Sequence, residues 1–216
     1  MMKSLLRRVI PAVFAVALVL LVLTVSIGLP IYCRPFYYAH IDALNLERSG
    51  FTENQIRTAY DQVLDYLTLP GKPFGTGELA YSAEGEAHFA DCKVLFDLNA
   101  GVMLISAFCV AFILVLRRLG KVPSLCRAAF FAGAGAITVP LAVGGLAALD
   151  FGRAFVIFHR IFFPGKDNWM FNPRTDEIIL VLPQEFFRNC AILIGAGLLV
   201  MSVLLMILSK NKRAQC

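Results

Sequence analysis

Three histidines, His40, His88 and His159, are the side chains of this sequence best able to transfer protons at neutral pH. An unperturbed imidazole has a pKa near 6.5, so it can accept or donate a proton under ordinary conditions. His88 and His159 each adjoin a long apolar stretch, whereas no motif surrounds His40. We therefore expect His88 and His159 to act beside a membrane and His40 to be structural.

Charged residues follow His88 at short spacing. Asp91 comes three residues later, where a carboxylate on a helix can approach the imidazole and fix its tautomer. Lys93 lies at the edge of the apolar stretch, where its cation could stabilise developing negative charge or contact a lipid headgroup. The pattern predicts acid–base chemistry close to lipid.

Aromatic side chains are concentrated in residues 150–188, which hold Trp169, the only tryptophan of the chain, and eight phenylalanines. The phenylalanines are Phe151, Phe155, Phe158, Phe162, Phe163, Phe171, Phe186 and Phe187. The first four are spaced to share one face of a helix. That face could anchor the segment at the membrane interface or line a site for an acyl chain.

Motifs of other chemistries are missing from the sequence. It has no Gly-x-Ser-x-Gly, His-Glu-x-x-His or Cys-x-x-Cys, no phosphate loop and no dinucleotide fingerprint. No pair among the histidines and Asp91 has a spacing typical of zinc ligands, so we expect no metal. No covalent acyl-enzyme is indicated either. What remains is general acid–base catalysis on a substrate attached to lipid.

Membrane helices must position these residues. The chain is 58% hydrophobic and 16% charged, which is too apolar for a soluble domain of 216 residues. Four stretches without charge can each cross a bilayer: 9–33, 98–116, 128–149 and 189–209. We expect a single integral membrane domain over residues 1–216. It is an all-α polytopic protein with four transmembrane helices and a small extracellular cap of helices and loops, formed by residues 34–97 and 150–188.

Charge sets the expected orientation. The two tails and the loop after the second span hold ten of the twenty basic residues and none of the fifteen acidic ones. The positive-inside rule therefore places both termini in the cytoplasm. The basic pI follows from this topology and gives no argument for nucleic-acid binding, so we expect anionic lipid headgroups as partners of the basic side.

Local signals add three further expectations. Thr52 and Gln55 form a capping box that starts an amphipathic helix over residues 52–69, and residues 84–97 lead as a helix into the second span. Pro140, among several glycines, predicts a kinked third span packed closely on a neighbour. Cys33 and Cys92 could form a disulfide outside the cell, but the sequence leaves this open.

The segments around His88 and His159 resemble the bacterial lipoprotein intramolecular transacylase family, Lit. The resemblance is carried by Glu86–Lys93 and Phe158–Phe163, followed by Gly165, Trp169, Phe171, Pro173, Asp176, Leu182–Pro183 and Phe186–Phe187. The layout of four spans is similar along nearly the whole chain. Cys92 departs from the family's pattern, which has a small aliphatic residue at that position.

The resemblance implies a function. The family moves the sn-2 acyl chain of the diacylglyceryl group on a lipoprotein to the α-amino group of its N-terminal cysteine, giving a lyso-form lipoprotein. Diacylglyceryl-modified lipoproteins and membrane lipids are then the partners, and a monomer in the bacterial cell membrane, with its active site at the extracytoplasmic interface, is expected. Because converting an ester to an amide is downhill, no cofactor is needed; the difficulty is one of proximity and orientation.

The resemblance also implies roles for individual residues. His88 and His159 match the family's two catalytic histidines: one removes the amine's proton and the other protonates the departing glyceryl oxygen, in an order that the sequence leaves open. Lys93, Trp169 and Tyr37 are candidate donors to the oxyanion, the last two equally candidates for the wall of the pocket. The remaining supporting candidates are Asp91, Phe158, Phe162, Phe163, Phe171 and Asp176.

Two alternatives remain. A noncatalytic assembly or lipid-sensing protein would tolerate replacement of the histidines but not of the aromatic residues. An acyltransferase working between two molecules would have separate donor and acceptor species as its products.

Overall fold

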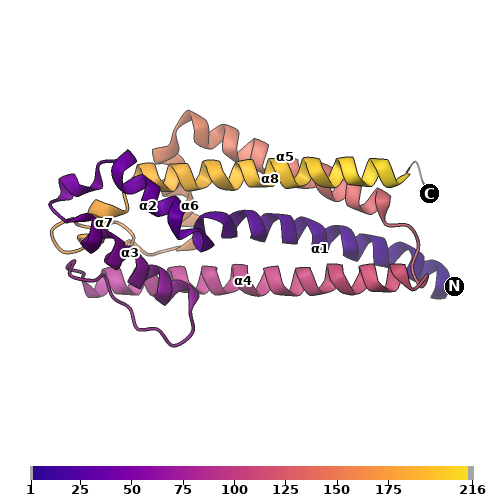
Figure 1. Cartoon of the computed structure of the whole chain (residues 1–216), viewed down its shortest axis with the longest axis horizontal. Coiled ribbons are helices and arrows are strands. Elements are labelled where there is room, and N and C mark those ends of the chain that lie inside the picture. Colours follow the sequence, from indigo (N-terminus) through magenta and orange to yellow (C-terminus); the bar gives the residue numbers. More distant parts are fainter. Residues whose placement is uncertain (1, 214–216) are drawn as a thin grey trace. The chain divides into compact units, whose positions relative to one another are not determined.

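The computed structural model describes residues 2–213, except for the side chains of 2–8, 139–143, 145–149 and 211–213. Within this part of the chain the regular structure is entirely helical, as expected (Figure 1). The helices are α1 (Met2–Tyr32), α2 (Arg34–Ala43), η1 (Leu46–Ser49), α3 (Glu53–Thr68), α4 (Ala83–Arg118), α5 (Cys126–Leu149), α6 (Phe151–Phe162), α7 (Ile178–Val181) and α8 (Gln184–Arg213).

The chain divides into two compact units. The bundle unit comprises Met1–Leu29, Asn99–Gly145 and Leu193–Cys216, and the polar unit comprises Pro30–Leu98 and Leu146–Ile192. All fifteen acidic residues of the sequence belong to the polar unit, whereas the bundle unit holds ten basic residues and no acidic one. The two units therefore differ in charge in the same way as the cytoplasmic and outer segments of a membrane protein, of which the cytoplasmic ones carry the excess of basic residues.

Among the described residues, three helices are long and apolar enough to cross a membrane: Val9–Tyr32, Ala83–Arg118 and Gln184–Lys210. A shorter apolar stretch, Cys126–Thr138, lies in α5. About 20 apolar residues are needed to span the hydrocarbon core. Phe108 and Ile105 on α4 are more than 70% exposed, as expected of side chains that face lipid. The chain is thus a multi-pass membrane protein.

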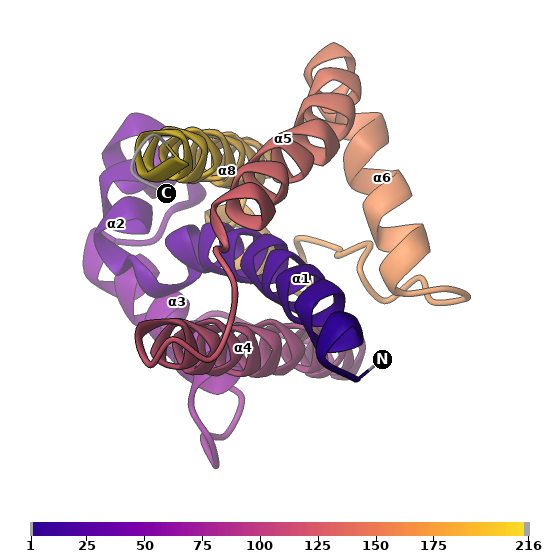
Figure 2. The ribbon, with the colours of Figure 1, turned by 90° about the vertical axis from the view of Figure 1, so that its right-hand side faces the viewer.

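The helices of the bundle unit run alongside one another (Figures 1 and 2). Apolar side chains hold them together. Phe14 and Leu18 of α1 pack with Val110 and Ile113 of α4 and with Ala132 of α5. Without a hydrophobic force between helices in lipid, such van der Waals contacts are a main source of their association.

A glycine lets α5 approach α8 closely. A Cβ atom added to Gly133 would lie 2.8 Å from the carbonyl oxygen of Ser202 and 3.0 Å from Cγ of Met206, so the expected close packing is present at this glycine. At Gly135 the same addition would meet nothing within 4 Å. The helix α5 continues through Pro140, whose side chain is outside the described part, so the expected kink stays a prediction.

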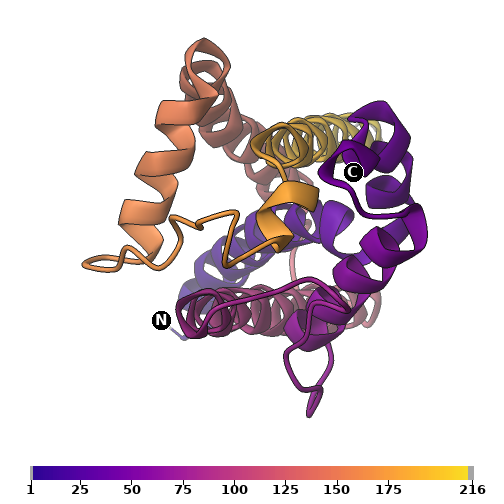
Figure 3. The same cartoon turned by 90° about the vertical axis from the view of Figure 1, so that its left-hand side faces the viewer.

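The polar unit has a core of its own, formed by α2, η1, α3 and α7 (Figure 3). Thr52 caps α3 as predicted: its hydroxyl accepts from the Gln55 amide, and the Gln55 side chain accepts from the Thr52 amide. The apolar face that follows buries Ile56 and Val63 against Ile41 of α2. The predicted amphipathic helix is therefore confirmed as a packing element.

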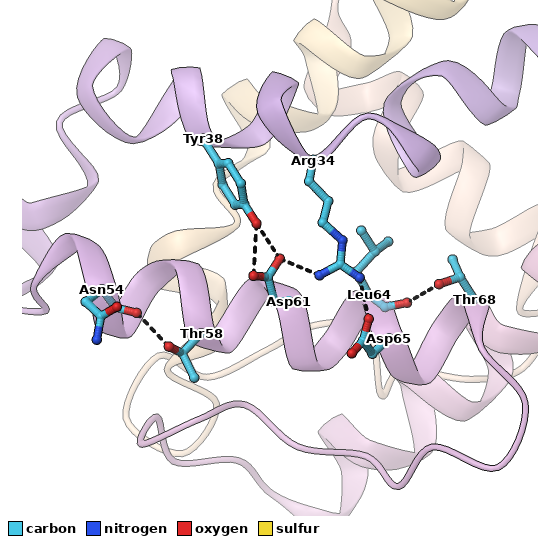
Figure 4. Close-up of polar contacts among 8 residues, drawn as sticks. All are labelled: Arg34, Tyr38, Asn54, Thr58, Asp61, Leu64, Asp65 and Thr68. Atoms are coloured by element: carbon cyan, nitrogen blue, oxygen red, sulfur yellow. Dashed lines mark hydrogen bonds and ion pairs between the residues drawn. The ribbon is translucent and has the colours of Figure 1, made fainter.

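An ion-pair network joins α2 to α3 (Figure 4). The Arg34 guanidinium pairs with Asp61, at 2.7 Å, and with Asp65. The Tyr38 hydroxyl donates to Asp61 at 2.7 Å. Because one guanidinium serves two carboxylates one turn apart, the network fixes the rotation of α3 relative to α2 as well as the distance between them.

The two glycines of α5 give a matched test of the bundle. We expect Gly133→Ala to lower the melting temperature in detergent, because a methyl group forced against the Ser202 carbonyl costs about 1–3 kcal/mol by overpacking. Gly135→Ala should leave the temperature unchanged or raise it slightly, since alanine favours a helix and has open space there. Equal melting temperatures for the two variants would contradict this packing of α5 on α8.

Candidate active site

Two histidines separated by 71 positions in the chain come together in the polar unit. The ring centroids of His88, on α4, and His159, on α6, are 5.8 Å apart. Both side chains are buried, with 6% and 7% of their surfaces exposed. The structure thus brings together the pair that the sequence singled out.

The start of α4, which carries His88, is anchored by Asp176. Its Oδ1 accepts hydrogen bonds from the amide and the hydroxyl of Ser82, and its Oδ2 accepts one from the Thr175 hydroxyl. Gly85 is required beneath this carboxylate, because a Cβ atom there would overlap Asp176 Oδ1. Asp176, predicted as a supporting residue, therefore positions the helix end, and both its oxygens are occupied.

His159 has a fixed tautomer. Its Nδ1 lies 2.7 Å from the carbonyl oxygen of Phe155, which can only accept, so Nδ1 carries the proton. The Nε2 atom of the neutral ring then has a free lone pair. Trp169 stacks on the imidazole, with ring centroids 4.7 Å apart, and holds its plane. His159 is therefore arranged as a base at Nε2.

His88 is hydrogen-bonded at the other ring nitrogen, Nε2. Cys92, one turn later on α4, has its Sγ atom 3.4 Å from Nε2 of His88. Burial raises the pKa of the Cys92 thiol to about 12, so the sulfur keeps its proton and donates it to the better acceptor, the ring nitrogen. The proton of the neutral ring is then on Nδ1, which is buried and has no hydrogen-bond partner among the residues that the structure describes. His88 therefore offers an N–H group that is available to a substrate.

Aromatic rings enclose both imidazoles. Phe163 and Phe171 contact His88 with centroids 5.0 and 5.5 Å away, and Phe155 and Phe158 contact His159 at 4.2 and 5.4 Å. Burial, followed by repulsion from His159, lowers the pKa of His88 to about 4. Burial also lowers the pKa of His159. Both rings are consequently neutral at pH 7.

Asp91 does not hydrogen-bond to His88, contrary to the sequence-based expectation. Its carboxylate accepts from Lys166 Nζ at 2.6 Å and from Asn168 Nδ2 at 3.3 Å. The hydrogen bond from Lys166 lowers the pKa of Asp91. The residue that fixes the tautomer of His88 is instead Cys92, at the i+4 position.

Each of the three predicted oxyanion donors has another hydrogen-bond partner. Lys93 donates to the carbonyl of Tyr66 at 2.7 Å and pairs with Asp97 at 4.0 Å. Tyr37 is fully buried and donates to the carbonyl of Val181 at 2.7 Å, while Trp169 donates to that of Lys166 at 2.9 Å. Tyr37 and Lys93 thus belong to the packing around α3 and α7, and Trp169 is a wall residue of the site.

The predicted phenylalanines differ in exposure. Phe163 is buried beside both histidines, whereas Phe158 and Phe162 contact each other and are about half exposed. Phe171 packs on His88 and Phe89. One side of α6 is therefore buried beside the histidines, whereas the side that carries Phe158 and Phe162 is exposed.

Two further expectations can be compared with the structure. His40 donates from Nδ1 to the carbonyl of Phe36 at 2.6 Å and packs against Phe186, as a structural histidine does. Cys33 and Cys92 are both free thiols, so the disulfide that the sequence left open is not formed.

Sequence reasoning missed three residues of this region: Cys92, Lys166 and Asn168. The i, i+4 spacing of His88 and Cys92 on one helix could have revealed the first pair. No local pattern could reveal the other two, because they reach Asp91 from more than seventy positions away in the chain.

The chain is similar to known proteins over most of its length. The family model of the lipoprotein intramolecular transacylase Lit matches residues 12–187. The structure of the membrane integral lipoprotein intramolecular transacylase Lit from Bacillus cereus is 26% identical, with a TM-score of 0.89 over 99% of this chain and 100% of that one.

Structures of two variants of the Bacillus cereus protein, in which one histidine is replaced by alanine or by arginine, are also similar. Their TM-scores are both 0.82, at 25% and 26% identity, over 100% of this chain and 98% and 97% of theirs. A comparison with curated proteins gave no match. The family model covers most of the chain and the structural likeness extends over nearly all of it, so the chain belongs to the lipoprotein intramolecular transacylase family Lit.

Proposed function

We propose that His88 and His159 carry out the family's intramolecular transacylation in this chain, moving the sn-2 acyl chain of a diacylglyceryl lipoprotein to the α-amino group of its N-terminal cysteine. The observation that carries the proposal is the pair of buried, neutral imidazoles 5.8 Å apart, one with a free lone pair and the other with a free N–H. An acyl transfer to an amine needs one acceptor and one donor of this kind.

His159 is the base in this proposal. When the neutral amine attacks the ester carbonyl, its nitrogen becomes positively charged and strongly acidic. Nε2 of His159, whose proton is held on Nδ1 by Phe155, takes the excess proton. A low pKa does not prevent this step, because the ammonium of the tetrahedral adduct is far more acidic than a free amine.

His88 is the donor. Its Nδ1–H has no partner within the described part of the chain and can donate to the carbonyl oxygen as that oxygen becomes negative. Because its pKa is about 4, His88 is a poor source of a full proton at pH 7. The geometry therefore favours a hydrogen-bond donor to the oxyanion over the full general acid that the sequence suggested for one of the histidines.

The proton balance closes with these two residues. The C–N bond forms as the amine nitrogen loses one proton to His159, and the ester C–O bond breaks as His159 returns that proton to the glyceryl oxygen. Both imidazoles end neutral, and no further reactant is consumed. The aromatic residues around the pair, Phe163, Phe171 and Trp169 among them, would exclude water that could hydrolyse the ester.

We extend the proposal to the membrane topology. The long helices and α5 would make four spans in the bacterial cell membrane, with both termini in the cytoplasm and the polar unit with its site at the extracytoplasmic interface. The distribution of charge between the two units supports this orientation.

Replacement of either histidine tests the chemistry. We expect His88→Gln and His159→Gln each to lower the formation of lyso-form lipoprotein by about 10²-fold or more, because the first removes the Nδ1–H donor to the oxyanion and the second removes the base. The measurement is mass spectrometry of a reporter lipoprotein's N-terminal peptide from cells that otherwise make only the diacylglyceryl form. Transfer leaves the total mass unchanged and moves one acyl chain to nitrogen in the fragments.

His40→Gln is the matched control, since His40 lies in the same unit but contacts Phe36 and Phe186. This variant should form lyso-form lipoprotein as well as the unmodified protein does, once the amounts of expressed protein are taken into account. Full activity in both the His88 and His159 variants would show that another group performs the acid–base chemistry.

The lowered pKa values predict an unusual pH profile. A histidine with a lowered pKa stays neutral at pH values where an ordinary one becomes charged, so His88 remains neutral down to about pH 4. The kcat/KM of the purified protein should therefore rise with a single ionisation near 7.7–8.0, that of the substrate's amine. A second, enzymatic ionisation at 6.5 or above would be inconsistent with two buried neutral imidazoles.

Topology can be tested with a pair of exposed lysines, one from each unit. In a Cys33→Ser background, Lys72→Cys should react with a membrane-impermeant maleimide added to intact cells, whereas Lys121→Cys should react only after the cells are opened. The positive-inside rule predicts this difference in labelling, because residue 121 lies in the basic loop after the second span. Labelling of residue 121 from outside, with residue 72 protected, would reverse the proposed orientation.

A further inference from the structure

In the described part of the polar unit, two buried polar side-chain atoms have no hydrogen-bond partner: Nδ1 of His88 and Oδ1 of Asn168. Leaving such an atom unpaired costs about 1–3 kcal/mol, and folded proteins rarely do so. The proposed mechanism uses Nδ1 of His88. It gives no role to the oxygen of Asn168.

The orientation of the Asn168 amide follows from its neighbour. Its nitrogen lies 3.3 Å from Oδ2 of Asp91, and a carboxylate can only accept hydrogen bonds. The NH₂ group must therefore face Asp91, which leaves the oxygen as the unpaired atom. Asp91 is itself held by Lys166 at 2.6 Å, so the amide cannot turn without losing this contact.

The loop that carries Asn168 is fixed by its own hydrogen bonds. The Lys166 amide donates to the Phe163 carbonyl at 3.2 Å, and the Met170 amide donates to the Asp167 carbonyl at 3.0 Å. The Trp169 indole donates to the Lys166 carbonyl at 2.9 Å. The side chain of Asn168 thus extends from a hydrogen-bonded turn, and its amide nitrogen is held by Asp91.

Neighbours on both sides connect Asn168 to the two histidines. Trp169, the next residue, stacks on His159. Asp91, its hydrogen-bond partner, lies one turn after His88 on α4 and acts electrostatically on that ring. The unpaired oxygen therefore belongs to the surroundings of the imidazole pair.

We propose that Asn168 is a substrate-positioning residue whose Oδ1 accepts an N–H hydrogen bond from the α-amino group that attacks the ester. The inference rests on the proposed function. A primary amine that has begun to attack carries two hydrogens: Nε2 of His159 takes one, and Oδ1 of Asn168 holds the other. With both hydrogens directed in this way, the lone pair of the amine faces the ester carbonyl, which is the orientation the reaction requires.

The first test removes the acceptor at nearly constant volume. We expect Asn168→Leu to lower kcat/KM for a synthetic diacylglyceryl peptide about 10-fold, the effect of losing roughly 1.4 kcal/mol of hydrogen bonding to the substrate. Asp167→Ala is the matched control, because Asp167 is an exposed neighbour in the same turn. It should leave kcat/KM unchanged.

A second substrate separates this role from a structural one. A peptide with N-methylcysteine at its N-terminus has one amine hydrogen, which His159 removes, and none for Asn168. The preference of the unmodified protein for the primary amine over the N-methyl amine should therefore fall about 10-fold in Asn168→Leu and in Asn168→Ala. This ratio does not depend on how much of each variant is folded.

An unchanged ratio in both variants would overturn the role of Asn168, whatever their absolute rates. The proposed function is judged separately by the histidine variants: if these abolish transfer while the amine preference is unchanged, the function stands and the positioning role fails. If the unmodified protein transfers no acyl chain to the primary amine, the function itself fails.

Discussion

The site depends on keeping two imidazoles neutral, buried and only half hydrogen-bonded. Removing an imidazole from water disfavours its charged form, and leaving one ring nitrogen unpaired adds a further cost. The surrounding structure offsets these costs with fixed contacts. The Phe155 carbonyl holds the proton of His159 on Nδ1, the Cys92 thiol occupies Nε2 of His88 and so leaves the proton of that ring on Nδ1 as well, and Trp169 stacks on the ring of His159. No hydrogen bond within the described part of the chain occupies Nε2 of His159 or Nδ1 of His88, so both atoms are available for the substrate, which connects the energetics of the fold to its chemistry.

In the proposed topology, the length of α4 allows a polar site to lie beside the membrane. The helix α4 is 36 residues long, or about 54 Å, which exceeds the thickness of a hydrocarbon core, so its charged first turns extend beyond the apolar stretch that begins at residue 98. His88 is on this extension. Asp176 anchors the first turn through Ser82, and α6 supplies His159 from a segment that follows α5. Because the start of α4 is held in this way, the buried imidazole of His88 is positioned by a helix and not by a mobile loop.

Much of this could be predicted from the sequence, because the signals are local. Helix periodicity and the absence of charge indicated the apolar helices, the capping box at Thr52 fixed the start of α3, and the motifs around His88 and His159 identified the pair. The partners of the site could not be predicted in this way. Asp91 has the spacing to reach His88, yet it is paired with Lys166 from another segment, and Tyr37 was a candidate donor until its hydroxyl was found on the carbonyl of Val181. Spacing along a helix tells which side chains can meet; which of them do meet depends on contacts between distant parts of the chain.

Whether the acyl chain moves within one substrate molecule can be decided by a crossover experiment. Two synthetic lipopeptides are mixed with the purified protein, one with isotopically heavy acyl chains on a light peptide and the other with light acyl chains on a heavy peptide. With transfer inside one molecule, every N-acylated lyso product keeps the isotopic pairing of its parent, as seen by mass spectrometry of the intact peptides. Products that combine a heavy acyl chain with a heavy peptide, in the proportion expected from random exchange, would contradict it.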